Sequence, residues 1–589
     1  MTRTTMSRRI LGVICVVGIF LIIAIGRLVE IQVVQAATLN EEAAGKMSQT
    51  HVLFGTRGSV TDRNGTVLAE AQMRYNVTAS PSQSLNEFSR TVDGKRVSVS
   101  TAQAATEIAQ LVGKTPQAVI DILNAALTED PHSEYAVIAK SVDLTAFRAL
   151  DALGIPWLYF EQAPSRVYPN GAVAGNLVGF VGEDGQALAG LELSNEECLA
   201  GVNGEQTSDR SARESITIPG SQVVTKPAKT GGKLTLTIDA DVQWYVQQVL
   251  AKQVEDQHGS WGMAVVEEVK TGKLVAVADY PSIDPNNVNG TSENYRGSLA
   301  FSAPYEPGST MKPLTASMLL DQGKVTPETH VYSPYEITHD NGANFHDSGY
   351  HASNLTLTGV LVESSNVGIS QVGDLISADK RYDFMTKFGF GSTSEVDFLG
   401  ESTGILRTPD EWDNQTFYTM MFGQGFTATA IQMASAYQAL GNGGVRLPVQ
   451  LVESCTADDG SVSKPSLPGP VRVVSESAAR TSVDMMENVA TKGWLRDKLA
   501  IGGYRVAAKT GTAQQADGNG GYSDSYIVSL EGLVPADNPQ YVVLVTIADT
   551  DMNTTGAVAP VFHDIAAHVL KQYRVQPSTG SAPDFPLNY

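Results

Sequence analysis

The strongest constraint on how this chain folds is an apolar stretch close to its start. Residues 10–26 carry no charge, three arginines precede them, and the first acidic residue is Glu30. About 17 apolar residues are near the lower limit for a helix that crosses a bilayer. The basic flank predicts a cytoplasmic tail, residues 1–9, and places the rest of the chain on the outer side of the membrane. We therefore expect one transmembrane anchor over residues 10–30.

A cleaved signal peptide is the alternative for this stretch. Residues 34–36, Val-Gln-Ala, would serve as a cleavage site. However, the apolar core of a signal peptide usually spans about 7–15 residues, which is shorter than this one. We favour an uncleaved anchor, and in either case most of the protein is exported. The polar residues 38–56 that follow predict a helical tether.

Length and charge limit what the exported part can be. At 589 residues the chain exceeds one typical domain, so we expect two or three. A hydrophobic content of 42% is normal for a globular protein with an ample core. The formal net charge of −22 argues against nucleic acid as a partner.

A Ser-x-x-Lys motif lies at the start of a predicted helix in the second half of the chain. Residues 305–313 read Tyr-Glu-Pro-Gly-Ser-Thr-Met-Lys-Pro and lead into an apolar run. The Pro-Gly pair indicates a loop, and the residues after it favour a helix start. On a helix Ser309 and Lys312 share one face, so the amine can contact the hydroxyl. A desolvated lysine can take the serine proton, and the positive helix end would stabilise an oxyanion.

This motif is short, and the chain contains it three times. The other two copies, at residues 377–380 and 461–464, lie in a polar stretch and in a predicted solvated loop. Ser364-Ser365-Asn366 and Lys509-Thr510-Gly511-Thr512 follow the copy at Ser309 in chain order. Ser-x-x-Lys, a Ser-x-Asn-like triplet and Lys-Thr-Gly, in this order, are typical of penicillin-binding proteins and class A β-lactamases.

Lys-Thr-Gly also occurs more than once, and position separates the copies. The copy at residues 229–231 precedes the predicted nucleophile. The copy at residues 270–272 lies between two apolar segments and predicts an ordinary hairpin turn. The order of the motifs therefore selects Lys509.

Together these motifs resemble those of the class B penicillin-binding proteins, the membrane-anchored D,D-transpeptidases that cross-link bacterial cell wall. The Tyr-Glu-Pro-Gly-Ser variant is most similar to the cell-division (FtsI-type) branch. The resemblance spans the chain from Arg57 to about Gln572. It includes the segment 57–69, where Asn64-Gly65 predicts a hairpin. The resemblance places this segment in a pedestal domain that supports the catalytic domain. There we expect the charged residues Arg57, Arg166 and Glu192 to form a salt-bridged core rather than a catalytic site.

The resemblance implies an α/β (α+β) chain with a single N-terminal transmembrane helix and two exported domains. An elongated pedestal, a dimerisation-type domain, is expected over residues 38–225. A transpeptidase domain with a central antiparallel sheet flanked by helices is expected over residues 232–575. The last residues, 576–589, are rich in Ser, Pro and Gly and predict a disordered tail.

The predicted site combines the three motifs. Residues 504–508, just before Lys509, alternate in the pattern of a β-strand, and we expect them to form an edge strand that faces the nucleophile. Such an edge can pair with an extended stem peptide. Lys509 supplies positive potential for a carboxylate, and Gly511 lets the backbones approach. The resemblance implies an oxyanion hole from the N–H groups of Ser309 and Thr512, proton relay by Ser364, and substrate orientation by Asn366. The predicted catalytic residues are Ser309, Lys312, Ser364, Asn366 and Lys509, and the predicted substrate-binding residues are Thr510, Gly511 and Thr512.

A loop rich in histidine and aspartate separates the first two motifs. His339, Asp340, His346, Asp347 and His351 would suit a metal ion, but their spacing matches no standard zinc pattern. A loop bordering the active-site cleft is the better interpretation, and we expect neither a metal nor an organic cofactor.

The three cysteines do not predict a disulfide framework. Cys15 falls in the apolar stretch, which leaves Cys198 and Cys455 as one possible pair. Because they lie in different predicted domains, we expect two unpaired thiols.

The expected function is cross-linking of peptidoglycan stem peptides through a serine acyl-enzyme, in septal wall synthesis, with covalent binding of β-lactams. An elongation-type transpeptidase, a D,D-carboxypeptidase, a β-lactam-hydrolysing or sensing relative and a non-catalytic scaffold are the alternatives. The resemblance further implies a glycan-polymerising membrane partner of the SEDS (FtsW-like) family and other division proteins.

Overall fold

The computed structural model describes residues 3–35, 38, 48–92, 94–182, 184–209, 218, 220–516 and 522–589. The chain forms two compact units. The first contains Met1–Thr56 and Gly201–Gly231, and the second contains Arg57–Ala200 and Gly232–Tyr589. Two separate stretches of sequence therefore build each unit.

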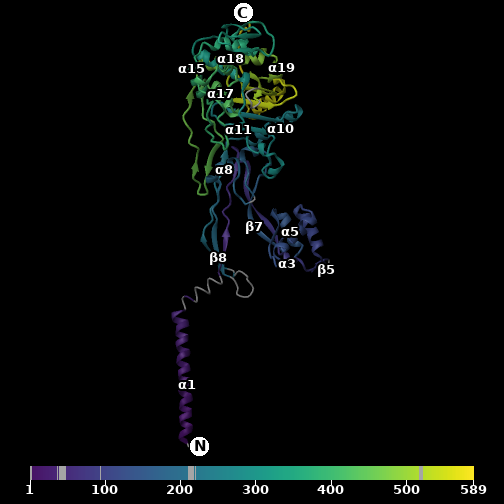
Figure 1. Ribbon diagram of the computed structural model, residues 1–589, viewed down its shortest axis with the longest axis vertical. Helices are drawn as coiled ribbons and strands as arrows, with labels where there is room; N and C mark the ends of the chain where they lie inside the picture. The colour runs from purple at the N-terminus through teal and green to yellow at the C-terminus, as the bar shows by residue number, and fades with distance from the viewer. Residues whose placement is uncertain are drawn as a thin grey trace. The chain divides into compact units, whose positions relative to one another are not determined.

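The first unit begins with one continuous helix. Helix α1 (Arg3–Val29) continues into a π-helical turn at Glu30–Val34 (Figure 1). The part from Ile10 to Val34 is long and apolar enough to cross a membrane. Its large side chains are exposed, with Phe20 at 70%, as expected for residues that contact lipid. The helix begins earlier and its apolar part ends later than the sequence predicts.

A small antiparallel sheet completes this unit. It joins β1 (Ser48–Leu53), β8 (Gly204–Asp209) and β9 (Val223–Lys226), in the order β1-β8-β9. The predicted helical tether is therefore wrong for residues 48–53, because pairing with β8 satisfies their backbone groups. Residues 39–47 of that prediction lie outside the described residues.

In the second unit, the predicted hairpin opens the pedestal part. Strand β2 (Val60–Thr61) turns at Gly65, which has φ +90°, into β3 (Val67–Ala79). Asp62 closes the turn by accepting hydrogen bonds from the N–H groups of Asn64 and Thr66. Strands β6 (Ala136–Val142) and β7 (Leu158–Val167) pair with β3.

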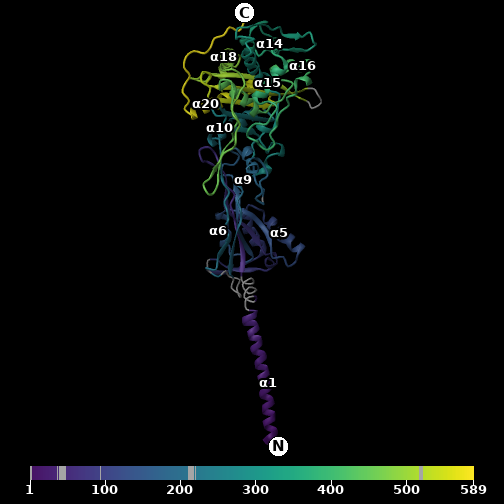
Figure 2. The same cartoon turned by 90° about the vertical axis from the view of Figure 1, so that its left-hand side faces the viewer.

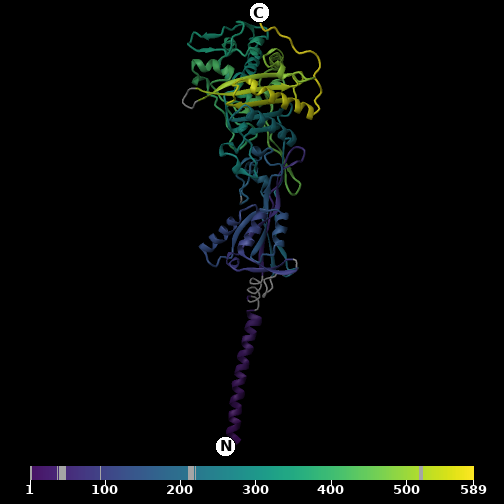
Figure 3. The same cartoon turned by 90° about the vertical axis from the view of Figure 1, so that its right-hand side faces the viewer.

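Three amphipathic helices lie against this sheet (Figures 2 and 3). Buried side chains such as Ile108, Leu123 and Leu150 form the core that they share with it. The helices are α4 (Thr101–Val112), α5 (Pro116–Glu129) and α6 (Leu144–Ala152). Each begins at a serine, threonine or aspartate whose side chain accepts a hydrogen bond from the third residue beyond it.

The pedestal sheet continues into the C-terminal half of the chain. Strand β10 (Lys233–Leu236) runs parallel to β2 and also pairs with β18 (Val452–Thr456). Cys455 lies opposite Leu234 in this pairing, and Gly232 N–H donates to the carbonyl of Cys198. The two cysteines form a disulfide with a Cα–Cα distance of 6.1 Å. Our expectation of two unpaired thiols is wrong, because the two predicted domains share one sheet at this point.

The predicted salt-bridged core of the pedestal is confirmed. Arg57 Nε and Arg166 Nε lie 2.6 Å from the two carboxylate oxygens of Glu192. The Glu192 side chain is fully buried. Two guanidinium groups therefore neutralise one buried carboxylate and leave neither of its oxygens unpaired.

The larger part of this unit is built on a five-stranded antiparallel sheet with the order β12-β11-β23-β22-β21. The strands are β11 (Trp261–Glu268), β12 (Leu274–Tyr280), β21 (Ala507–Ala516), β22 (Tyr522–Val534) and β23 (Tyr541–Ala548). Apolar residues alternate between two separate cores, such as Val265 and Leu544 in one and Val266 and Val545 in the other. The central antiparallel sheet is as predicted, and β21 is an edge strand.

Helices cover both faces of this sheet (Figure 2). Helices α10 (Ala240–Asp256) and α20 (Ala559–Gln572) pack on one face. The other face carries α12 (Lys312–Asp321), α17 (Ala430–Gly441) and α18 (Glu476–Lys492).

The prediction of a disordered tail over residues 576–589 is also wrong. Residues 576–589 run in an extended conformation and are bonded at several points. Thr356 N–H donates to Leu587 O at 2.9 Å, and Ser578 Oγ donates to Asp537 at 2.6 Å. The Tyr589 ring stacks on His330 with ring centroids 3.9 Å apart. Composition alone suggests disorder, but these backbone and ring contacts order the segment.

Candidate active site

The first motif lies in a tight turn that leads into a buried helix. Gly308–Met311 form a 3-10 turn that continues as α12. Residues three apart eclipse one another in such a turn. Lys312 Nζ accordingly lies 3.0 Å from Ser309 Oγ. The predicted contact of amine and hydroxyl is confirmed, although the turn is 3-10 rather than α-helical.

The second motif is a bent connection between two short helices. Helix α13 (Leu357–Val362) ends before it, and α14 (Asn366–Gly373) begins at its last residue. Ser364 has φ +59°, a conformation that a residue with a Cβ adopts only when its surroundings hold it there. Its carbonyl oxygen accepts a hydrogen bond from Lys312 Nζ, and Asn366 Oδ1 accepts another at 2.8 Å.

The third motif is part of the edge strand β21. Lys509 Nζ donates to Ser364 Oγ at 2.9 Å, to Thr510 O at 3.1 Å and to Thr510 Oγ1 at 3.2 Å. A Cβ on Gly511 would lie 2.9 Å from the carbonyl oxygen of Pro307. A Cβ on Gly308 would in turn lie 3.1 Å from Thr512 O. Glycine at these two positions therefore lets the third motif pack directly on the first.

The two lysines of the site are buried next to each other. Burial lowers the pKa of Lys312 to about 7, and the charge of Asp347 opposes this shift. Burial also lowers the pKa of Lys509, and repulsion from Lys312 lowers it further. Because the amines repel each other, the site favours one positive charge rather than two.

The hydrogen-bond partners favour Lys509 as the amine that carries this charge, and they oppose the effect of burial, which lowers its pKa. Its amine contacts three acceptors, which match the three hydrogens of an ammonium group. Lys312 Nζ contacts two groups that can only accept, Ser364 O and Asn366 Oδ1, which match the two hydrogens of a neutral amine. It also contacts two hydroxyls, Ser309 Oγ and Ser364 Oγ, which can donate to it. Its lone pair is then free to accept the proton of Ser309 Oγ. The arrangement can activate a serine nucleophile at neutral pH.

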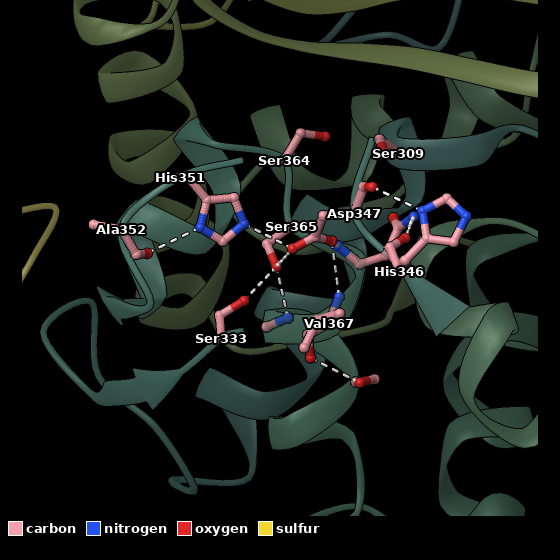
Figure 4. Close-up of polar contacts among 12 residues, drawn as sticks. Ser309, Ser333, His346, Asp347, His351, Ala352, Ser364, Ser365 and Val367 are labelled. Carbon is pink, nitrogen blue, oxygen red and sulfur yellow. Dashed lines mark hydrogen bonds and ion pairs between the residues drawn. The ribbon is translucent and has the colours of Figure 1, made fainter. Parts of the chain in front are cut away.

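The loop rich in histidine and aspartate borders this site, as predicted. It begins at the turn of the hairpin formed by β14 (Glu336–Thr338) and β15 (Asn344–His346). Asp347 contacts the second motif through both carboxylate oxygens, and His351 contacts Asp347 (Figure 4). Asn366 Nδ2 donates to His346 O at 3.4 Å. The position of the loop beside the site was predicted correctly. The individual contacts of Asp347, His351 and His346 could not be predicted, because the sequence shows only that the loop is rich in polar residues.

The structure thus brings all three predicted motifs together, with Ser309, Lys312, Ser364, Asn366, Lys509 and Thr510 in mutual contact. Two of the other motif copies serve local structure. Ser377 Oγ caps helix α15 (Ala378–Phe388) by accepting from Lys380 N–H, and Lys270–Gly272 form the turn between β11 and β12. One contact that the sequence did not suggest is Tyr437, whose hydroxyl donates to the Thr310 carbonyl at 2.7 Å, beside the predicted nucleophile.

Comparisons with known proteins agree with the motifs. The penicillin-binding protein transpeptidase domain matches residues 262–567, and the penicillin-binding protein dimerisation domain matches residues 53–236. The chain is 32% identical to penicillin-binding protein PbpB of Mycolicibacterium smegmatis, over 96% of this chain and 90% of that protein. It is 31% identical to the peptidoglycan D,D-transpeptidase FtsI of Escherichia coli, over 96% and 92%. The crystal structure of penicillin-binding protein 3 from Mycobacterium tuberculosis with ampicillin is 28% identical, covers 92% of this chain and 100% of that one, and gives a TM-score of 0.69.

Proposed function

This chain belongs to the class B penicillin-binding proteins, and we propose that Ser309, activated by Lys312, is the residue that carries its acyl group. The protein is a peptidoglycan D,D-transpeptidase with a transpeptidase domain that binds peptidoglycan and β-lactams. The observation that supports the residue assignment is the 3.0 Å contact between Ser309 Oγ and a fully buried Lys312 amine.

The first half-reaction forms an ester. Lys312 Nζ takes the proton of Ser309 Oγ, and the oxygen attacks the carbonyl carbon of the terminal D-Ala–D-Ala bond. The N–H groups of Ser309 and Thr512 stabilise the negative oxygen that forms. The C–N bond then breaks, and the leaving amine takes the proton held on Lys312. Ser364 passes this proton, because its hydroxyl lies 3.4 Å from Lys312 Nζ.

The second half-reaction transfers the acyl group. An amine of a neighbouring stem peptide attacks the ester, gives up a proton to Lys312, and the bond from carbon to Ser309 Oγ breaks as that oxygen regains its proton. The Lys509 ammonium attracts the substrate carboxylate, assisted by the hydroxyls of Thr510 and Thr512. Asn366 orients the substrate amide, and the edge strand β21 pairs with the extended peptide.

Covalent labelling tests the nucleophile. A fluorescent penicillin should label the full-length, detergent-solubilised protein once per chain, and Ser309→Ala should abolish labelling. Ser377→Ala removes a serine from the same Ser-x-x-Lys pattern and should label as the wild type does. Continued labelling of Ser309→Ala would overturn the assignment.

We further propose that the enzyme acts in septal rather than elongation wall synthesis. The FtsI-like Tyr305-Glu306 sequence before Pro307 supports this, and Glu306 Oε1 accepts a hydrogen bond from Gly425 N–H at 2.8 Å. Depletion should give cells that grow without septating, with a tagged copy at midcell. Rounded cells, with the tag along the side wall or at growing poles, would assign the enzyme to elongation.

The anchor supports two more specific proposals. With basic residues before α1, the N-terminus lies in the cytoplasm and the two domains lie outside the membrane. Gly12, Gly18 and Gly26 have open space beside their backbones, which suits close packing with helices of a SEDS (FtsW-like) partner. Replacing residues 10–34 with an unrelated span should preserve penicillin binding and abolish function in the cell. Full complementation by the replaced span would reduce the segment to a tether.

A further inference from the structure

A buried carboxylate holds the second motif in place. The Asp347 side chain is 3% exposed and accepts four hydrogen bonds (Figure 4). Asp347 Oδ1 accepts from the N–H groups of Asn366 and Val367, the latter at 3.0 Å. Asp347 Oδ2 accepts from Ser365 Oγ at 2.6 Å and from His351 Nε2 at 2.7 Å. The three residues after Ser364 are thus bonded to a single side chain.

The imidazole of His351 fixes the orientation of that carboxylate. His351 Nδ1 lies 2.9 Å from the carbonyl oxygen of Ala352, and Nε2 faces the carboxylate. Neither partner can donate, so both bonds form together only when both ring nitrogens are protonated. Burial lowers the pKa of His351, but the Ala352 carbonyl, Asp347 and the charge of Glu363 raise it, and the net shift is upward. His351 and Asp347 therefore form a buried ion pair.

The hydroxyls around this pair complete the network. Ser365 Oγ also accepts from Gly368 N–H at 2.7 Å and lies 2.6 Å from Ser333 Oγ. Since Ser365 donates to Asp347, Ser333 must donate to Ser365. The backbone of Asp347 is fixed as well, because its N–H donates to Tyr335 O at 2.9 Å. The network ties the loop to the first turn of α14.

The consequence for Lys312 follows from the chain geometry. Ser364 keeps its left-handed conformation only if the residues on either side are held. That conformation aims the Ser364 carbonyl at Lys312 Nζ, and the fixed start of α14 aims Asn366 Oδ1 at the same atom. Release of residues 365–367 would free both acceptors that orient the amine toward Ser309.

We propose that Asp347, oriented by His351, is a positioning residue that fixes the second motif around Lys312. The role rests on the proposed function, because it acts through the lysine that activates Ser309. Asp347 has no hydrogen bond to Ser309 or Lys312: it holds the motif through Ser365, Asn366 and Val367, and its charge acts on Lys312 from a distance.

The role predicts a change in pH dependence as well as in rate. The charged groups that face Lys312 are the Asp347 carboxylate, which raises its pKa, and the amine of Lys509. Removing the negative charge at position 347 should therefore move the midpoint of the acylation–pH profile to lower pH. A side chain that merely stabilised the fold would leave that midpoint unchanged.

The test compares acylation of the full-length protein and its variants by a fluorescent penicillin as a function of pH. Asp347→Asn should slow acylation by on the order of 10²-fold, the effect of a misplaced catalytic group, and shift the midpoint to lower pH. His351→Ala should be slower than His351→Gln, because glutamine can still donate one hydrogen bond to Asp347. Asp62→Asn is the matched control: Asp62 is 1% exposed, and its carboxylate accepts from three backbone N–H groups away from the motif.

The outcomes separate this role from the proposed function. Loss of labelling in Ser309→Ala with normal labelling in Asp347→Asn, at an unchanged midpoint, would overturn the positioning role and leave the proposed function standing. Equal slowing in Asp347→Asn and Asp62→Asn, without a shift in midpoint, would also overturn it. Wild-type protein that fails to label would overturn the proposed function and this role together.

Discussion

Two buried clusters of charged side chains in the second unit have opposite designs. In the pedestal, Arg57 and Arg166 each place a guanidinium nitrogen 2.6 Å from the carboxylate of Glu192. In the active site, the amines of Lys312 and Lys509 are fully buried with uncharged acceptors around them. The acid in the second cluster, Asp347, is already bonded to His351. In the pedestal each arginine is paired with a carboxylate, and Glu196 is a second partner of Arg57. In the active site two neighbouring amines repel each other, so that they are not both charged at once.

The difference separates a structural role from a chemical one. A buried charge that is paired keeps its charge, and its removal leaves the partner unpaired and destabilises the fold. A buried amine without a carboxylate partner shifts its pKa instead, and such shifts are characteristic of functional sites. Arg57 accordingly has a raised pKa, because its interactions with Glu192 outweigh burial, whereas the pKa of Lys312 falls to about 7.

The largest predicted effect is on acylation, and it comes from changing one of the two buried amines in the active site. Lys312→Arg places a permanent cation at the position and removes the proposed base, because arginine stays protonated. We expect acylation by a fluorescent penicillin, measured on the fraction that remains folded, to fall by about 10³-fold. Lys380→Arg changes the lysine of a second Ser-x-x-Lys copy and should acylate normally. Near-normal acylation by Lys312→Arg would show that the amine is not the base.

The next largest effect is on stability, and it comes from removing the carboxylate that pairs with Arg57 and Arg166 in the pedestal. Glu192→Gln leaves two arginines without their buried carboxylate, and we expect a loss of ~3–5 kcal/mol in the free energy of unfolding. Denaturant unfolding measures this loss, and the fraction that remains folded should still acylate at the wild-type rate. Glu196→Gln, at the exposed second partner of Arg57, should cost much less. Equal losses in the two variants would contradict the importance of burial.

The ion pair of His351 and Asp347 predicts a stability difference that depends on pH. His351→Gln should cost ~1–3 kcal/mol where the wild-type imidazole is charged. Because the pKa of His351 is raised in the folded protein, its stabilisation is complete below its ordinary pKa and is lost as pH rises through the raised value. The difference between wild type and variant, measured by urea unfolding across pH, should therefore shrink toward alkaline pH. A constant difference would argue against a charged His351.

The smallest effect concerns a charge pair at the surface. Lys492 Nζ lies 2.5 Å from Asp584 in the C-terminal segment, but the aspartate side chain is 85% exposed. Water screens such pairs, so Asp584→Asn should change the free energy of unfolding by less than about 0.5 kcal/mol. A loss comparable to that of Glu192→Gln would remove burial as the factor that separates the two kinds of pair.

Sequence patterns predicted the features that depend on local periodicity and motif order. The edge strand at Lys509 and the turn at Ser309 belong to this class. Features that depend on where loops meet were not predictable. Asp347 and Ser365 belong to different segments of the chain, and they come into contact only when the loop folds back onto α14. The disulfide was missed because Cys198 and Cys455 come together through strand β10, which lies between them in the chain. The ordered tail was missed because its contacts are mostly made by backbone groups, which composition does not show.

The most direct test of the central claim is the pH dependence of acylation in the wild-type protein. Burial without a carboxylate partner is expected to keep Lys312 neutral near physiological pH. The rate constant for acylation by a fluorescent penicillin, measured between about pH 5 and 10, should rise through a midpoint near 7 and then level off. A rate that continues to rise toward the ordinary lysine pKa of about 10.4 would contradict the account.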